Sequence, residues 1–82
     1  MTPKEQLERA VSLAGGQSQM AGRIGGSTKP AHVWNWLNRD NQLPGEHVIS
    51  VSRAVDWQVT PHELRPDLYP HEQDGLPRES AA

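Results

Sequence analysis

The chain has 82 residues, of which 34% are apolar and 22% charged, with seven glycines, seven prolines and no cysteine. This length fits one small domain, and the lack of cysteine excludes disulfide bonds and thiolate metal ligands. Because so small a core is marginal, helix packing or self-association has to supply the stability that disulfides would provide.

The formal charge of −2 is unevenly distributed along the chain. Residues 1–55 contain six Lys or Arg and four Asp or Glu, whereas residues 56–82 contain two and six. The sequence therefore combines a mildly basic body with an acidic tail. It has no apolar run of about 18 residues and no signal pattern at its N-terminus, so we expect a soluble protein of the cytoplasm with no membrane partner.

The first helix is predicted over residues 3–14. Thr2 can cap it, proline suits the first helical position, and Glu5 completes a capping box. Apolar residues then recur at helical spacing, and Gly15 and Gly16 can adopt the positive φ that often ends a helix.

A second and a third helix are predicted over residues 18–24 and 29–38, separated by a glycine-rich turn. In the second helix, the small residue Ala21 faces inward. In the third, Val33 and Trp36 are spaced to lie on the buried side. A small residue at this place allows two helices to cross closely, which is typical of a helix-turn-helix.

A fourth helix follows Pro44 and has a broad apolar face, and Thr60–Glu63 repeats the capping box for a short fifth helix that stops before Pro66. Leu64, Leu68 and Tyr69 are expected to pack over the core. No alternating strand pattern of useful length occurs, so we predict an all-α fold of five helices.

The C-terminal residues are proline-rich and acidic, and they offer few large apolar groups to offset the entropy lost on ordering. We therefore predict a helix-turn-helix domain over residues 1–70 and a short disordered acidic tail over residues 71–82.

The outward face of the third helix carries polar side chains that can hydrogen-bond to the base edges of double-stranded DNA. The predicted base-contacting residues are Lys29, His32, Asn35 and Asn38. A second set lies where the motif would meet the DNA backbone. The predicted phosphate-contacting residues are Gln17, Gln19, Arg23, Thr28 and Arg39. The alternative for each residue is an ordinary solvated surface.

Two tryptophans in the third helix are expected to play different roles. Trp36 belongs to the core, because its spacing from Val33 matches the buried side. Trp34 points away from that side, and three environments stay open for it: the DNA surface, a dimer interface, or a position folded back onto the fourth helix.

Other chemistry has little support in the sequence. The four histidines have no partner at helical spacing for a zinc site, and Pro66 stands where a second metalloprotease histidine would follow His62. The glycines match no nucleotide-binding loop. An 82-residue helical chain also has little room for a pocket that excludes water, so we expect no metal, no cofactor and no enzymatic activity.

Three segments carry a family resemblance: GGQSQMA at residues 15–21, HVWNWL at 32–37 and HELRPDLYP at 62–70. Together they resemble the YdaS-like, Cro-type family of helix-turn-helix regulators of phages and prophages. The resemblance covers about residues 3–70 and implies a lambda-repressor-like fold of five helices and a role as a DNA-binding repressor or antitoxin-like partner of a toxin. The turn before Val33 is about two residues longer than in the usual motif.

The leading hypothesis is a sequence-specific transcriptional regulator of a phage, prophage or toxin–antitoxin operon that binds an operator as a homodimer. The alternative is a protein-binding antitoxin or assembly module that uses Trp34 and the acidic tail to engage a toxin or another protein.

Overall fold

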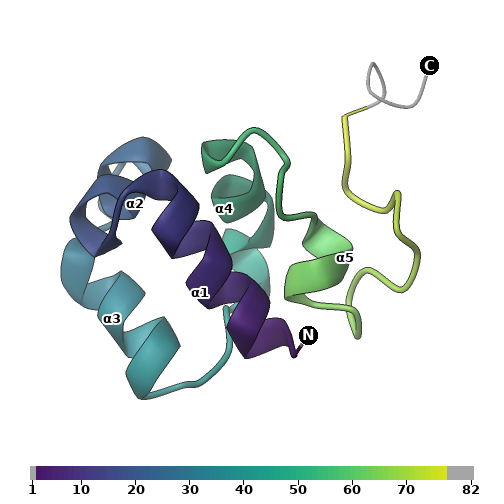
Figure 1. Cartoon of the computed structure of the whole chain (residues 1–82), viewed down its shortest axis with the longest axis horizontal. Coiled ribbons are helices and arrows are strands. Elements are labelled where there is room, and N and C mark those ends of the chain that lie inside the picture. The colour runs from purple at the N-terminus through teal and green to yellow at the C-terminus, as the bar shows by residue number, and fades with distance from the viewer. Residues whose placement is uncertain (1, 78–82) are drawn as a thin grey trace.

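The structure is a computed structural model that describes residues 2–77. These residues form five α-helices and one 3₁₀ turn and contain no strand, which confirms the predicted all-α class (Figure 1). In chain order the elements are α1 (Pro3–Ala14), α2 (Gln17–Ile24), α3 (Pro30–Asn38), η1 (Gly45–His47), α4 (Val48–Ala54) and α5 (Pro61–Leu64). No helix in the described part of the chain is long and apolar enough to cross a membrane.

Both predicted capping boxes are present. The Thr2 hydroxyl accepts from the Glu5 amide at 3.1 Å, and the Glu5 carboxylate accepts from the Thr2 amide at 2.9 Å. These bonds with Thr2 hold the pKa of Glu5 below its usual value. At α5, Thr60 and Glu63 exchange the same two kinds of bond. Each box satisfies backbone N–H groups that have no partner within the helix.

The core runs through the whole molecule beneath the helices. Its fully or nearly buried apolar residues come from every α-helix and from two loops: Leu7, Ala10, Val11, Ala14, Met20, Ala21, Val33, Trp36, Leu43, Val48, Val51, Val55, Val59 and Leu64. Leu43 and Val59 are loop residues that helical periodicity does not select. The ring of Trp36 packs against the imidazole of His47 with the ring centroids 4.8 Å apart. α3 is therefore packed against the core through Val33 and Trp36, the two residues predicted to be buried.

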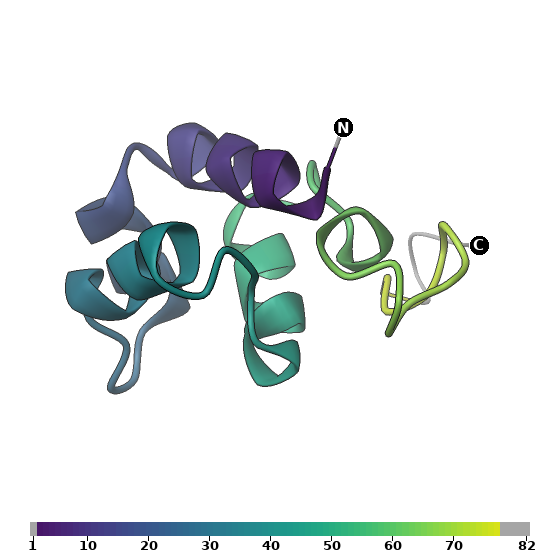
Figure 2. The same ribbon diagram turned by 90° about the horizontal axis from the view of Figure 1, so that it is seen from below.

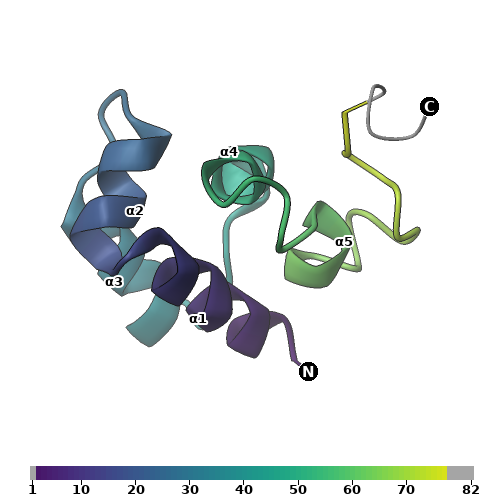
Figure 3. The same ribbon diagram turned by 45° about the horizontal axis from the view of Figure 1, so that its top comes forward.

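The helices are arranged along the long axis of a molecule that measures 35 × 22 × 19 Å. α2 and α3 lie at one end and α5 lies at the other, with α4 between them (Figures 1 and 2). α1 packs on α2, α3, α4 and α5 and so connects the two ends (Figure 3). α3 and α5 do not pack on each other.

The helix boundaries differ from the prediction in three places. α3 begins at Pro30, one residue later than predicted, because Lys29 is its N-cap. α2 begins at Gln17, one residue earlier than predicted. The predicted fourth helix is preceded by the 3₁₀ turn η1, which follows Pro44 and leads directly into α4. A 3₁₀ turn is a common start for an α-helix because its tighter bonds use up free backbone groups.

The chain beyond α5 forms a strap over residues 66–77 on the far side of α4 and α5 (Figure 1). Leu68 is half-exposed but packs over Gly45, where a Cβ would lie 2.8 Å from the leucine Cδ1. Gly75 has a φ of 79°, and a Cβ there would lie 2.9 Å from both Ile49 and Pro61. Residues 71–75 form a bend and turns, and residues 78–82 of the predicted disordered tail lie outside the described residues, so the tail and the domain boundary at residue 70 stay predictions.

Candidate nucleic-acid interface

The pairing of α2 with α3 has the elements that a helix-turn-helix requires. Ala21 in the middle of α2 is only 3% exposed, and α2 packs closely on α3. Gly25 and Gly26 both have positive φ, 76° and 63°, which glycine adopts without the steric penalty of a Cβ. The small residue and the glycine turn therefore occupy the places where the motif needs them.

The outward face of α3 is set by helical spacing. Val33 is fully buried and Trp36 is 4% exposed, so these two residues fix the inward side. Asn35 lies four residues after Ala31 and three before Asn38, which places the three on one face. Ala31 and Asn38 are exposed and Asn35 is half-buried. This face contains two amides and a methyl group that lie outside the core.

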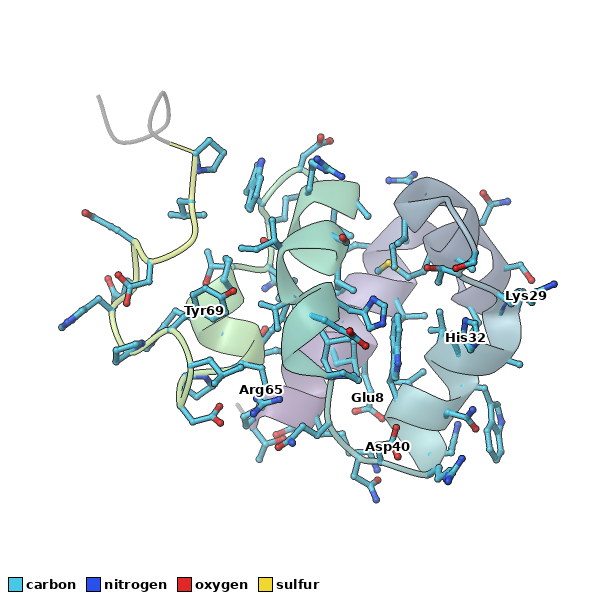
Figure 4. All side chains as sticks on the ribbon, turned by 180° about the vertical axis from the view of Figure 1, so that it is seen from behind. Glu8, Lys29, His32, Asp40, Arg65 and Tyr69 are labelled. Carbon is cyan, nitrogen blue, oxygen red and sulfur yellow. The ribbon has the colours of Figure 1, made fainter. Side chains whose placement is uncertain are left out.

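His32 and Lys29 lie at the start of α3. The backbone N–H of Lys29 donates to Nδ1 of His32 at 3.0 Å, so the imidazole caps the helix from its third position. Because a backbone amide can only donate, Nδ1 is the acceptor, and in the neutral ring the hydrogen is on Nε2. Both side chains are exposed, and Lys29 extends away from the protein beside His32 (Figure 4).

The two asparagines of α3 differ in the bonds that they make within the protein. Nδ2 of Asn38 donates to the backbone oxygen of Trp34 at 3.1 Å, one turn earlier. This bond uses part of the amide and leaves Oδ1 as an acceptor. No hydrogen bond within residues 2–77 uses the side chain of Asn35, so both its carbonyl oxygen and its NH₂ group are available to a partner.

The predicted phosphate-contacting residues have different environments. Gln19 and Arg39 are exposed, whereas Gln17, at the start of α2, and Thr28, in the turn before α3, are half-buried. Arg23 is exposed but already has a partner within the protein.

Nη1 of Arg23 donates to the backbone oxygen of Ala54 at 3.0 Å. Ala54 is the last residue of α4, where a cation is favoured by the helix dipole. The described geometry thus gives Arg23 a structural role in joining α2 to α4. A phosphate contact from this side chain would have to share or break that bond.

Trp34 is 51% exposed, in contrast to Trp36, which lies two residues further along α3 on the buried side. Of the three environments left open by the sequence, a position folded back onto α4 is not supported, because Trp34 is half-exposed and α3 does not pack on α4. Trp34 lies four residues before Asn38 and therefore borders the outward face of α3.

Charge separates the two ends of the molecule. Residues 17–39, which form α2, the turn and α3, contain three basic residues and no Asp or Glu. Residues 60–77, which form α5 and the strap, contain four acidic residues and one arginine. An anionic partner is therefore attracted to the α3 end and repelled by the strap.

Sequence reasoning missed two groups of residues. Ala31 has no hydrogen-bonding group, but its position one turn before Asn35 places it on the outward face. Arg65 donates to Asp67 at 2.9 and 2.7 Å and to the backbone oxygen of Leu43 at 2.8 Å. The pairing with Asp67 raises the pKa of Arg65 and lowers that of Asp67. Only the arginine-to-aspartate spacing was visible in the sequence.

Taken together, the α2–α3 pair and its exposed polar face are those of a small helix-turn-helix domain. A family model described as "Bacterial toxin YdaS" matches residues 7–73. The chain belongs to this family, which confirms the resemblance seen in its sequence. It is also 39% identical over 62 residues to "Putative transcriptional regulator YdaS" of Escherichia coli strain K12.

That alignment covers 76% of this chain and 61% of the relative, so the chain spans less than two thirds of the length of the curated protein it matches. No solved structure matches the chain.

Proposed function

We propose that the chain is a sequence-specific DNA-binding transcriptional regulator that inserts α3 into the major groove. The observation that carries the proposal is the outward face of α3, with its exposed polar side chains, in a segment that contains basic residues and no acidic ones. The relative is named as a transcriptional regulator and not as an enzyme, which supports a regulatory role.

Apart from Arg23, which is bonded to Ala54, each predicted residue has a role in this proposal. The amide of Asn35 can accept from adenine N6 through its oxygen and donate to N7 through its NH₂ group, a contact worth about 1–3 kcal/mol of discrimination. His32, Lys29 and Asn38 contact neighbouring bases, and the Ala31 methyl can lie against a thymine methyl. Gln17, Gln19, Thr28 and Arg39 contact phosphates and set the position of α3 in the groove.

The regulator acts as a homodimer on an operator with two-fold symmetry, because one short helix contacts few bases and two half-sites about 34 Å apart supply the rest. The family resemblance favours a Cro-like repressor of a phage, prophage or toxin–antitoxin operon, which would act in the cytoplasm, where bacterial DNA is.

The proposal is tested by selecting sequences from a random duplex library with the full chain and measuring affinity for the enriched site between about 50 and 200 mM salt. We expect a symmetric site and an affinity that falls steeply with salt, because each contacted phosphate adds about −0.9 to the slope of log K against log salt. Absence of enrichment, or an affinity independent of salt, would contradict it.

A matched pair of variants locates the phosphate contacts. Arg39→Ala removes an exposed cation at the end of α3 and should reduce the steepness of the salt dependence by about 0.9. Lys4→Ala removes the same charge from the first turn of α1, at the α5 end of the molecule, and should leave the slope unchanged (Figure 1). Equal effects would mean that net charge alone, and not the α3 end, determines binding.

The exposure of Trp34 supports a second candidate function, a protein-binding antitoxin or assembly module. In this case Trp34 and the acidic strap engage a toxin or another protein, and DNA binding is secondary. An exposed indole next to amides is suitable for a protein interface as well as for DNA.

The second candidate is tested by co-expressing the chain with the products of the genes beside its own. Trp34→Ala and Glu72→Gln should then abolish co-purification and leave operator affinity intact. Charge neutralisation is preferable to deleting residues 71–82, because Gly75 packs against Ile49 and Pro61. Loss of operator affinity with Trp34→Ala would place the tryptophan at the DNA instead.

A further inference from the structure

We infer that His32 selects guanine in the major groove, because the bond that caps α3 leaves its imidazole with only a hydrogen-bond donor to offer. This inference rests on the proposed function and names the base that one residue of the interface recognises. Two observations carry it: the 3.0 Å bond from the Lys29 amide to Nδ1, and the exposure of the His32 side chain.

The first step concerns the proton on the ring. A free histidine can present either a donor or an acceptor to a base, because its two neutral tautomers are close in energy. In this chain Nδ1 accepts the Lys29 N–H, so its lone pair is occupied and the hydrogen of the neutral ring is on Nε2. The outer edge of the imidazole therefore presents a single N–H donor.

The second step concerns the base edges. In the major groove guanine presents two adjacent acceptors, N7 and O6. Adenine presents one acceptor beside the N6 donor, thymine presents O4 beside a methyl group, and cytosine presents the N4 donor. A single N–H donor therefore fits guanine best and is opposed by cytosine.

A contrast within the molecule shows that the tautomer of His32 comes from its position. His62 has Nδ1 2.7 Å from the backbone oxygen of Tyr69. A carbonyl can only accept, so there Nδ1 carries the hydrogen. The two rings are therefore fixed in opposite tautomers, and only that of His32 is on the recognition helix.

The experiment compares the base preferences of the wild-type chain with those of three His32 variants and one control variant, using selection from the same random duplex library. For the wild type we expect one position in each half-site at which guanine is favoured about fivefold to tenfold, the lower end of the range for a bidentate base contact, because His32 offers one donor. His32→Ala should remove the preference at that position only.

Two variants keep the helix cap and differ in what they offer the base. Gln and Glu at the third helical position both accept the capping N–H. In His32→Gln the amide oxygen accepts the capping N–H and the amide NH₂ remains as a donor, so the preference for guanine should persist. His32→Glu leaves a second carboxylate oxygen as an acceptor and should change the preference to cytosine, whose N4 donates to a carboxylate. Because both retain the cap, loss of folding cannot account for a changed preference.

His71→Ala is the matched control, since it removes an exposed imidazole from the strap at the opposite end of the molecule, and it should leave every position unchanged. An unaltered guanine preference in His32→Ala would overturn the inference while leaving the proposed function intact. A wild-type preference for adenine, thymine or cytosine at the affected position would overturn the donor assignment. If the wild type enriches no sequence, the proposed function fails, and the inference fails with it.

Discussion

The two ends of this molecule differ in how many of their polar side chains are bonded within the protein. At the α5 end, Glu63 bonds to Thr60 and to Gln6 of α1, and Arg65 bonds to Asp67 and to the backbone of Leu43. At the α3 end, Asn35 makes no side-chain bond within residues 2–77 and His32 makes one. Polar groups that pair within the protein stabilise it, whereas unpaired exposed groups are available to a partner.

The comparison also explains why the conspicuous HELRPDLYP segment need not touch DNA. Its charged residues are used to attach the strap and the loop at Leu43 to α5. The segment lies at the end of the molecule opposite to α3 (Figure 1). Resemblance alone does not separate a residue that holds the fold together from one that binds a ligand, but the bonding partners do.

The largest effect is expected from removing the buried tryptophan that packs α3 against the core. Trp36→Ala should lower the free energy of unfolding by about 3–5 kcal/mol, because it removes a buried aromatic side chain and its packing on His47. Thermal unfolding followed by circular dichroism measures the loss. Trp34→Ala is the matched control and should change stability by about 0.5 kcal/mol or less. Similar losses would mean that the two tryptophans are not divided between core and surface.

The next effect concerns recognition and not stability. Asn35→Ala should reduce the preference for the selected operator over random DNA by about 1–3 kcal/mol, with thermal stability almost unchanged. Arg39→Ala should weaken binding to the selected operator and to random DNA by the same factor. Arg39 is a better comparison than Arg23, whose bond to Ala54 would mix stability with binding. A large loss of stability in Asn35→Ala would contradict the contrast between the ends.

A smaller effect is expected at α5. Thr60→Ala removes the capping hydroxyl and should lower the free energy of unfolding by about 1 kcal/mol. Thr60→Ser keeps the hydroxyl and should retain most of the stability. The base preference of the folded protein should be unchanged in both, as measured by selection. An altered preference would show that the α5 end takes part in reading DNA.

The smallest effect is a dependence on pH. The Arg65 guanidinium donates to Asp67 and lowers its pKa, so the pairing is present above the usual aspartate value of 3.8 and is lost as the pH falls through the lower folded-state pKa. Asp67 is exposed, so the effect is small. Chemical denaturation of wild type and Asp67→Asn at pH 7 and at about pH 3 should show the difference between them shrinking in acid. A constant difference would mean that the ion pair contributes nothing.

Much of the fold could be predicted because its signals are local. The capping boxes at Thr2 and Thr60 occupy four residues each, and the Val33–Trp36 spacing defines the buried side of α3. The family resemblance was carried by short contiguous segments and is confirmed by the relative. Features of this kind depend on neighbours in the chain, so a single sequence contains them.

Contacts between distant residues could not be predicted. Arg23 and Ala54, or Arg65 and Leu43, come together only when the helices pack. The left-handed backbone of Asp56 and Trp57 likewise has no glycine to indicate it, and tertiary packing has to maintain it. For the candidate site, the sequence indicated which residues face outward but not which atoms are already in use. The DNA contacts themselves stay predictions.

The position of α1 links the stability of the two ends of the molecule. Because this one helix packs on elements from both ends, weakening either end lowers the fraction of molecules that are folded. Substitutions at α5 would then change the amount of folded protein, whereas substitutions on the outward face of α3 would change the proposed preference for a DNA sequence. Protein abundance and target choice could therefore evolve separately within a chain of 82 residues.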